Sequence, residues 1–159
     1  QAKTLFPYTT LFRSTMLIPG TNGGKMSKSA NNIINIFLED KALRKQVMSI
    51  ETDSTPLEEP KNTETCKIFA IYKLLATEEQ TKTMAQNYTN VNRDFGYGHA
   101  KQALFELILE KFKTERETYT HYMNNLPEIE AALLKGAAKA QVVANGVLSR
   151  VREKLGFRG

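Results

Sequence analysis

Residues 15–29 read TMLIPGTNGGKMSKS, and this stretch decides which fold the sequence is expected to have. Residues 16–18 are an apolar run typical of the end of a strand. Three glycines within residues 20–24 make a loop with little steric restriction on φ. KMSKS, residues 25–29, follows this loop directly. Two ammonium groups three residues apart, with hydroxyl and backbone N–H donors between them, suit a polyphosphate. The stretch therefore predicts a phosphate-binding loop at the end of an α/β domain.

Two simpler interpretations of this loop are a P-loop and a solvated loop without function. The spacing from Gly20 to Lys25 is one residue shorter than in a P-loop, and Met26 stands where a P-loop requires serine or threonine. The P-loop interpretation therefore fails. A solvated lysine–serine loop stays open as the structural alternative.

Beyond the loop, apolar residues recur mainly at helical spacing. Residues 43–48 predict a helix that ends near residue 49, and residues 52–60, with two prolines, predict a linker. Four further helices are expected to begin at Thr63, at Thr77 with a capping box to Gln80, after Gly98, and at Asn125 with a box to Glu128, the last ending at Gly156. The predicted fold is mostly α: a remnant of a Rossmann-type α/β domain that carries the KMSKS loop, followed by an antiparallel helical bundle.

Residues 4–14, TLFPYTTLFRS, resemble the translation of a common sequencing adapter joined in frame to a gene. The alternative is a native strand, because the segment contains good β formers, although it lacks an alternating pattern. We therefore expect residues 1–14 to be non-native and the gene product to be a fragment beginning near Thr15. The expected organisation is then the end of an α/β domain over 15–49, a linker over 50–63 and a helical domain over 64–159.

Composition excludes several classes of protein. The single cysteine, Cys66, excludes a disulfide framework and a multi-cysteine metal site, and it suits a reducing cytosol. With only His99 and His121, a histidine-based metal centre is not expected. The longest apolar runs fall far short of the roughly 20 residues of a membrane span. A net charge of +5 modestly favours anionic partners. We expect a cytoplasmic protein without a membrane partner.

KMSKS is the second signature of class I aminoacyl-tRNA synthetases, and residues 18–157 resemble the C-terminal portion of bacterial tryptophanyl-tRNA synthetases. The resemblance rests on residues 19–29, Thr52-Asp53-Ser54, Phe95-Gly96-Tyr97-Gly98 and the two long helices that follow. The five-residue signature is shared across class I enzymes, whereas the helical tail resembles the tryptophan enzyme in particular. By this resemblance, residues 15–49 are the end of the class I catalytic domain and residues 64–159 are an anticodon-binding-type domain.

The resemblance implies an enzyme that activates tryptophan with ATP and Mg²⁺ to tryptophanyl-adenylate and transfers it to tRNA(Trp), releasing AMP and pyrophosphate. It implies that Lys25 and Lys28 are catalytic, holding the departing pyrophosphate, and that Met26, Ser27 and Ser29 complete the ATP-binding loop. A full-length homodimer in the cytoplasm is also implied. Basic residues near the C-terminus are candidates for tRNA phosphate contacts, although solvated helix faces explain them equally well: Lys135, Lys139, Arg150, Arg152, Lys154 and Arg158.

The sequence departs from the family pattern in one respect. The first class I signature, His-x-Gly-His, is missing, together with the half of the Rossmann domain that binds adenine and tryptophan. Gly98-His99 does not replace it, because position 96 is glycine. We therefore expect the chain alone to be inactive. Two alternatives stay open: a stand-alone helical tRNA-binding module without catalysis, and another class I synthetase such as the tyrosyl enzyme. The intact signature favours an enzyme, and the weak net charge argues against a dedicated RNA binder.

Overall fold

The computed structural model describes residues 17–90 and 95–157. The segment expected to be adapter-derived, residues 1–14, lies outside the described residues, as does Met16, the first residue of the apolar run at residues 16–18. The chain divides into two compact units, one ending at Lys113 and the other beginning at Thr114. Each unit is described by itself.

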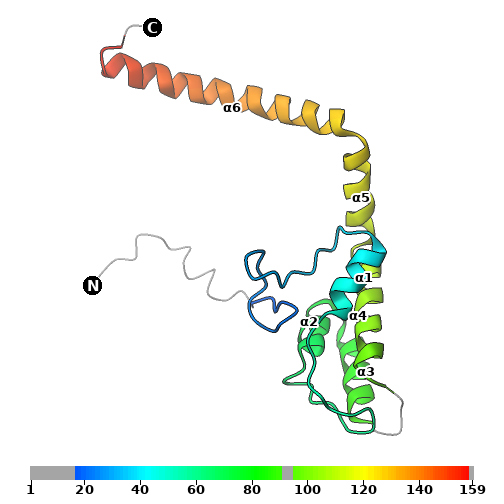
Figure 1. Cartoon of the computed structure of the whole chain (residues 1–159). Coiled ribbons are helices and arrows are strands. Elements are labelled where there is room, and N and C mark those ends of the chain that lie inside the picture. Colours follow the sequence, from blue (N-terminus) through cyan, green and yellow to red (C-terminus); the bar gives the residue numbers. More distant parts are fainter. Residues whose placement is uncertain (1–16, 91–94, 158–159) are drawn as a thin grey trace, which may run out of the picture. The chain divides into compact units, whose positions relative to one another are not determined.

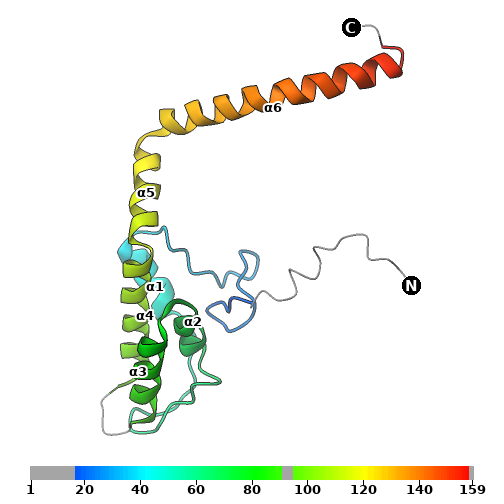
Figure 2. The ribbon, with the colours of Figure 1, turned by 180° about the vertical axis from the view of Figure 1, so that it is seen from behind.

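The first unit is built from four helices: α1 (Asp40–Met48), α2 (Lys67–Leu75), α3 (Glu78–Thr89) and α4 (Tyr97–Lys111). Helix α4 packs against α1 and α2, and α2 packs against α3 (Figures 1 and 2). Each helix contributes an apolar face to one shared core, as the sequence periodicity predicts. The largest fully buried side chains are Leu43, Val47, Ile50, Ile68, Tyr88, Leu104 and Ile108.

The expected end of a strand is present only as a single antiparallel bridge between Pro19 and Lys25. Across residues 17–90 and 95–157 there is no extended strand, so the mostly helical fold class is confirmed while the Rossmann-type remnant is not seen. A strand requires a neighbour to share its ladder of hydrogen bonds. Within the described residues, the Ile18 carbonyl accepts from Met26 N, on the segment after Gly24.

Residues 50–63, the segment expected to be a linker, form a folded loop within the first unit. Ile50 is 1% exposed and Lys61 is 4% exposed. The Lys61 ammonium donates to the carbonyls of Pro56, Leu57 and Glu59 at 2.8–2.9 Å. The Lys61 backbone N–H donates to the carbonyl of Tyr88. The loop closes on itself because the buried Lys61 ammonium and these carbonyls are hydrogen-bonded to one another. The helices on its two sides share one core.

Replacing Lys61 with methionine is expected to lower the free energy of unfolding by about 2 kcal/mol, because three carbonyls lose a charged donor. Urea denaturation followed by circular dichroism measures the change. Lys82→Met, at an exposed position of α3, is the matched control and is expected to stay within about 0.5 kcal/mol of the parent. Equal urea midpoints for the two variants would show that the bonds from the Lys61 ammonium to the three carbonyls do not stabilise the loop.

The helix boundaries follow the sequence signals in some places and depart from them in others. Thr77 and Gln80 form the predicted capping box, with reciprocal bonds of 2.9 and 3.2 Å. The second predicted box does not form, because the Asn125 amide donates to the His121 carbonyl. The Glu128 carboxylate instead meets His121 Nε2 at 2.9 Å. The side chains of Asn125 and Glu128 therefore bind His121 and do not cap the helix.

The single helix expected after Gly98 is two helices, because α4 ends before Phe112 and α5 (Lys113–Asn124) follows. Helix α6 (Leu126–Lys154) is the last, and it ends as predicted at Gly156, where φ is +78°. Neither α5 nor α6 has a buried residue. The predicted antiparallel bundle over 64–159 is therefore seen only in part: α2 packs with α3 and α4, and the structure gives residues beyond 113 no core of their own.

The described helices include none that is both long enough and apolar enough to cross a membrane.

Candidate functional site

The glycine loop before the KMSKS signature is a tight hairpin, which we call the glycine hairpin (residues 20–24). Gly20 N donates to Gly24 O at 2.7 Å, and Gly23 N donates to Gly20 O at 2.9 Å. Gly23 has φ +83°, a left-handed value that glycine adopts without strain. A Cβ added at Gly20 would lie 2.4 Å from Asn32 Cγ. The loop that the sequence suggests to be unrestricted is therefore closely packed on Asn32.

Asn32 is the side chain that organises the signature backbone. It is 2% exposed. Its Nδ2 donates to the Lys25 carbonyl at 3.0 Å and to Asn22 Oδ1 at 2.7 Å, and its Oδ1 accepts from Ser27 N at 2.8 Å. One buried amide thus joins the glycine hairpin to two residues of KMSKS.

The structure places the predicted phosphate ligands together on one exposed turn. Lys25, Lys28 and Ser29 are exposed. Ser27 Oγ accepts from Ala30 N at 3.1 Å and lies 3.3 Å from Ser29 Oγ. Ser27 therefore shapes the turn, while the two lysine side chains extend from it. No carboxylate of the described residues forms an ion pair with either lysine. Both ammonium groups are available to an anionic ligand.

Met26 differs from the other signature residues, because its side chain lines an apolar cavity. The cavity has a volume of about 370 Å³ and is bounded by Ile34, Ile36 and residues of α2 and α4. The Met26 backbone N–H donates to the Ile18 carbonyl at 2.9 Å. Met26 thus joins the signature to the helical core.

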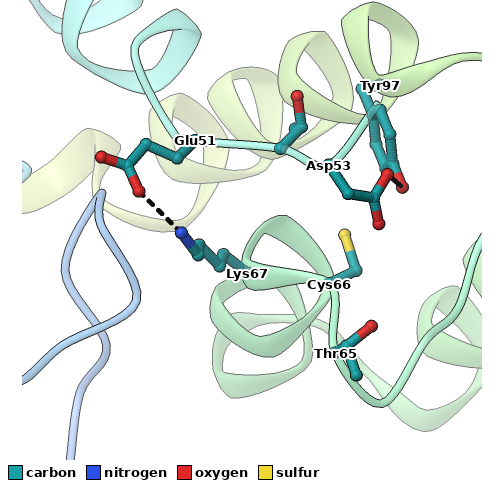
Figure 3. A pocket seen from close by; sticks show the side chains of 7 residues that line it. Glu51, Asp53, Thr65, Cys66, Lys67 and Tyr97 are labelled. Carbon is teal, nitrogen blue, oxygen red and sulfur yellow. Dashed lines mark hydrogen bonds and ion pairs between the residues drawn. The ribbon is translucent and has the colours of Figure 1, made fainter. Parts of the chain in front are cut away.

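A second cluster joins two of the stretches that carry the family resemblance. Tyr97 Oη donates to Asp53 Oδ1 at 2.6 Å, and Thr55 N donates to the same oxygen at 3.0 Å. Tyr97 and Asp53 border a cavity of about 280 Å³, which we call the Asp53 cavity (Figure 3). Thr52, Thr65 and Cys66 also line it, as does the ion pair between Lys67 and Glu51. The cavity offers both donors and acceptors of hydrogen bonds.

Hydrogen bonding sets the ionisation of this cluster. Bonds from Thr55 and then from Tyr97 hold the pKa of Asp53 below its ordinary value. Burial, together with donation to the Asp53 carboxylate, raises the pKa of Tyr97 to about 12. Burial also raises the pKa of Tyr88, whose hydroxyl lies 3.4 Å from Cys66 Sγ. Asp53 is therefore ionised and both tyrosines are neutral at pH 7.

The remaining candidates for chemistry have structural roles. His99 Nδ1 accepts from Gly96 N at 3.2 Å, and its ring stacks on Phe95 with centroids 5.8 Å apart, so it stabilises the start of α4. His121 is half exposed beside Glu128. Cys66 is 6% exposed and belongs to the core, as its sequence context predicts.

The sequence that forms the hairpin and its turn can be compared with models of known protein families. The model for "tRNA synthetases class I (W and Y)" matches residues 3–113, which is more than half of the chain. The chain belongs to this family of class I tRNA synthetases. The matched region holds the glycine hairpin, the signature and helices α1–α4.

Individual relatives of this class I synthetase chain are tryptophan–tRNA ligases. The ligase of Fusobacterium nucleatum is 40% identical over 153 residues, covering 96% of the chain and 46% of that protein. The ligase of Campylobacter jejuni is 41% identical over 141 residues, covering 89% and 44%. A crystal structure of the Campylobacter jejuni tryptophanyl-tRNA synthetase, complexed with ADP and tryptophan, gives a TM-score of 0.85 at 40% identity and covers 90% of the chain and 44% of its own. The chain thus spans a little less than half the length of these relatives.

Magnesium, which the family resemblance implies, does not fit the signature of this synthetase chain. Mg²⁺ prefers carboxylate, carbonyl, phosphate and water oxygens. The signature offers two ammonium groups, and the described residues hold no group of three or more His, Cys, Asp or Glu side chains that could bind a metal ion. No step is therefore assigned to a protein-bound metal.

Several residues that organise this synthetase site have no signal in the sequence. Asn32 is one of two adjacent asparagines after the signature, a pattern that predicts only a turn. Lys61 and Lys67 read as solvated lysines. Tyr97 and Asp53 appear in the stretches that carry the resemblance, but their pairing across 44 positions is visible only in the structure.

Replacing Tyr97 with phenylalanine is expected to raise the pKa of Asp53, because the carboxylate loses one of its donors. A lowered carboxyl pKa stabilises the fold above the ordinary value of 3.8, and this contribution is lost as pH falls through the pKa of the folded state. The variant should therefore lose less stability on acidification than the parent. A carbon-13 titration of the Asp53 carboxyl measures the change, and Tyr122→Phe, on α5, is the control. Identical Asp53 titrations in parent and Tyr97→Phe would contradict the expectation.

Proposed function

We propose that the chain is the C-terminal part of a tryptophan–tRNA ligase, which forms tryptophanyl-adenylate from tryptophan and ATP and transfers the tryptophanyl group to tRNA(Trp). The observation that carries the proposal is the KMSKS turn: Lys25 and Lys28 are exposed on a backbone held by the buried Asn32 amide. Identity of 40% to tryptophan–tRNA ligases supports the choice of amino acid.

In the first half-reaction, a carboxylate oxygen of tryptophan attacks the α-phosphorus of ATP. The bond from that phosphorus to the bridging oxygen breaks, and negative charge moves onto the departing pyrophosphate. Lys25 and Lys28 hold this group, and the Ser29 hydroxyl is a further donor. Preorganised charge of this kind stabilises the transition state more than the ground state. Met26 and Ser27 contribute through the backbone conformation that they impose on the loop.

In the second half-reaction, a hydroxyl of the terminal ribose of tRNA(Trp) attacks the adenylate carbonyl carbon and AMP leaves. The helical part of the chain approaches the anticodon arm, with the basic residues of α6 near phosphates. The intact enzyme is a cytoplasmic homodimer that uses ATP with Mg²⁺. The 159-residue chain alone is inactive, because it lacks His-x-Gly-His and the residues for adenine and tryptophan.

ATP–pyrophosphate exchange with a panel of amino acids tests the proposal. The intact enzyme is obtained by extending the gene upstream of the codon for Thr15. Exchange that depends on tryptophan is expected, and none is expected from the 159-residue chain. Exchange that depends on tyrosine would instead assign the chain to the tyrosyl enzyme. No exchange with any amino acid, combined with salt-dependent tRNA binding by residues 50–159, would assign it to an RNA-binding module.

A further inference from the structure

Helix α2 reaches the glycine hairpin through its first residue, Lys67. A Cβ added at Gly23 would lie 2.9 Å from Lys67 Cε and 3.1 Å from Lys67 Cδ. The aliphatic part of Lys67 therefore rests on the hairpin at the residue whose φ is +83°. A glycine at this position leaves room for the lysine as well as providing the left-handed backbone.

The Lys67 ammonium is bound by a second residue that also contacts the glycine hairpin. Nζ lies 2.7 Å from Glu51 Oε2 (Figure 3). Glu51 N donates to the Thr21 carbonyl at 2.9 Å, and Thr21 N donates to the Asn32 carbonyl at 2.9 Å. The hairpin is thus held on one side by Asn32 and on the other by the Lys67–Glu51 pair.

We propose that Lys67 and Glu51 are positioning residues that set the place of the KMSKS loop relative to helix α2. Neither residue belongs to the signature, and neither is assigned a contact with ATP. Their side chains are 32% and 62% exposed, so the pair contributes little to global stability. Its effect is local: it favours the hairpin conformation in which the turn before Lys25 contacts α2.

The pair also links the signature to the helical part of the chain. Lys67 begins the helix that packs against α3 and α4, so displacement of α2 moves the contact at Gly23. The proposal rests on the proposed function for its kinetic consequence, which is a change in how the loop binds ATP phosphates. Its structural consequence, protection of the hairpin amides, is independent of any activity.

Hydrogen exchange of the residue 20–24 amides in the intact enzyme is the first measurement. Lys67→Met and Glu51→Gln are each expected to speed exchange about fivefold, a typical size for coupling between neighbouring elements. Lys67→Arg should restore protection. Lys73→Met, at an exposed position of the same helix, is the matched control and should leave exchange unchanged. The double variant should be no faster than either single variant, because both remove the same interaction.

ATP–pyrophosphate exchange of the same variants is the second measurement. The KM for ATP should rise about fivefold in Lys67→Met and Glu51→Gln, with the KM for tryptophan unchanged. Unchanged hydrogen exchange of the hairpin amides in both variants would overturn the proposal. Hydrogen exchange accelerated equally in Lys73→Met would overturn it too. Faster hydrogen exchange of the hairpin amides, in an enzyme that shows no ATP–pyrophosphate exchange with any amino acid, would support the positioning role. It would reject the proposed function instead.

Discussion

Lys28→Ala in the intact enzyme is expected to slow tryptophan-dependent ATP–pyrophosphate exchange by about two orders of magnitude while leaving tryptophan binding nearly unchanged. The Lys28 side chain extends from the signature turn into solvent, so its removal leaves the hairpin and its hydrogen bonds intact. What is lost is a positive charge beside the departing pyrophosphate. Loss of one such preorganised group costs about 3 kcal/mol in the transition state.

The measurement separates kcat for activation from the dissociation constant of tryptophan. Lys41→Ala, at an exposed position of α1, removes the same charge outside the signature and should change neither quantity. Lys28→Arg keeps the charge and should retain part of the rate. A Lys28→Ala enzyme that loses tryptophan affinity as strongly as it loses rate would show that Lys28 does not act on the departing group.

Asn32→Ala is expected to produce the second largest loss, although Asn32 lies outside the signature and its side chain is buried. Removing the amide takes away the Asn32 partner of the Lys25 carbonyl and of Ser27 N, and it removes one of the two donors to Asn22 Oδ1, the other being Gly24 N. The loop then samples several conformations, so only a fraction of molecules present both lysines to the phosphates. We expect activation to slow about tenfold to a hundredfold, with the KM for ATP raised.

A positioning role for Asn32 requires that the defect be local. Circular dichroism and the urea midpoint should show that helices α1–α4 stay folded in Asn32→Ala. Asn35→Ala, which removes one exposed hydrogen bond to Phe37 N, is the matched control and should change activation less than twofold. Gly20→Ala places a methyl group against the Asn32 side chain and should reproduce the Asn32→Ala defect. Wild-type rates in both Asn32→Ala and Gly20→Ala would reject the role.

The features that the sequence predicts correctly are those set by neighbouring residues. The capping box from Thr77 to Gln80 needs only four consecutive residues, and it forms. Gly156 ends the last helix because glycine adopts a positive φ at little cost. The apolar positions of α1 and α4 recur with the helical period, so Leu43 and Leu104 are buried as expected.

Two sequence patterns met partners other than those that they suggest. Residues 50–63 have the composition of a linker, but Lys61 binds three carbonyls and closes the segment into a loop. The expected box at Asn125 fails because His121, in the preceding helix, takes the amide through its carbonyl. In both cases the partner lies two to five positions away: backbone carbonyls bind a side chain that the pattern assigns to solvent or to a cap.

The sequence by itself determined the donors of the candidate site: two lysines and two serines in five residues, a set that suits an anionic ligand. It also determined that the fold is mostly helical, because the helical period of apolar residues is local. Only the tertiary structure decided how the loop is held. The amide of Asn32, the Lys67–Glu51 pair and the bond from Tyr97 to Asp53 join residues that are not neighbours in a helix or turn. Such bonds depend on which segments the shared core brings together, and no spacing in the chain specifies them.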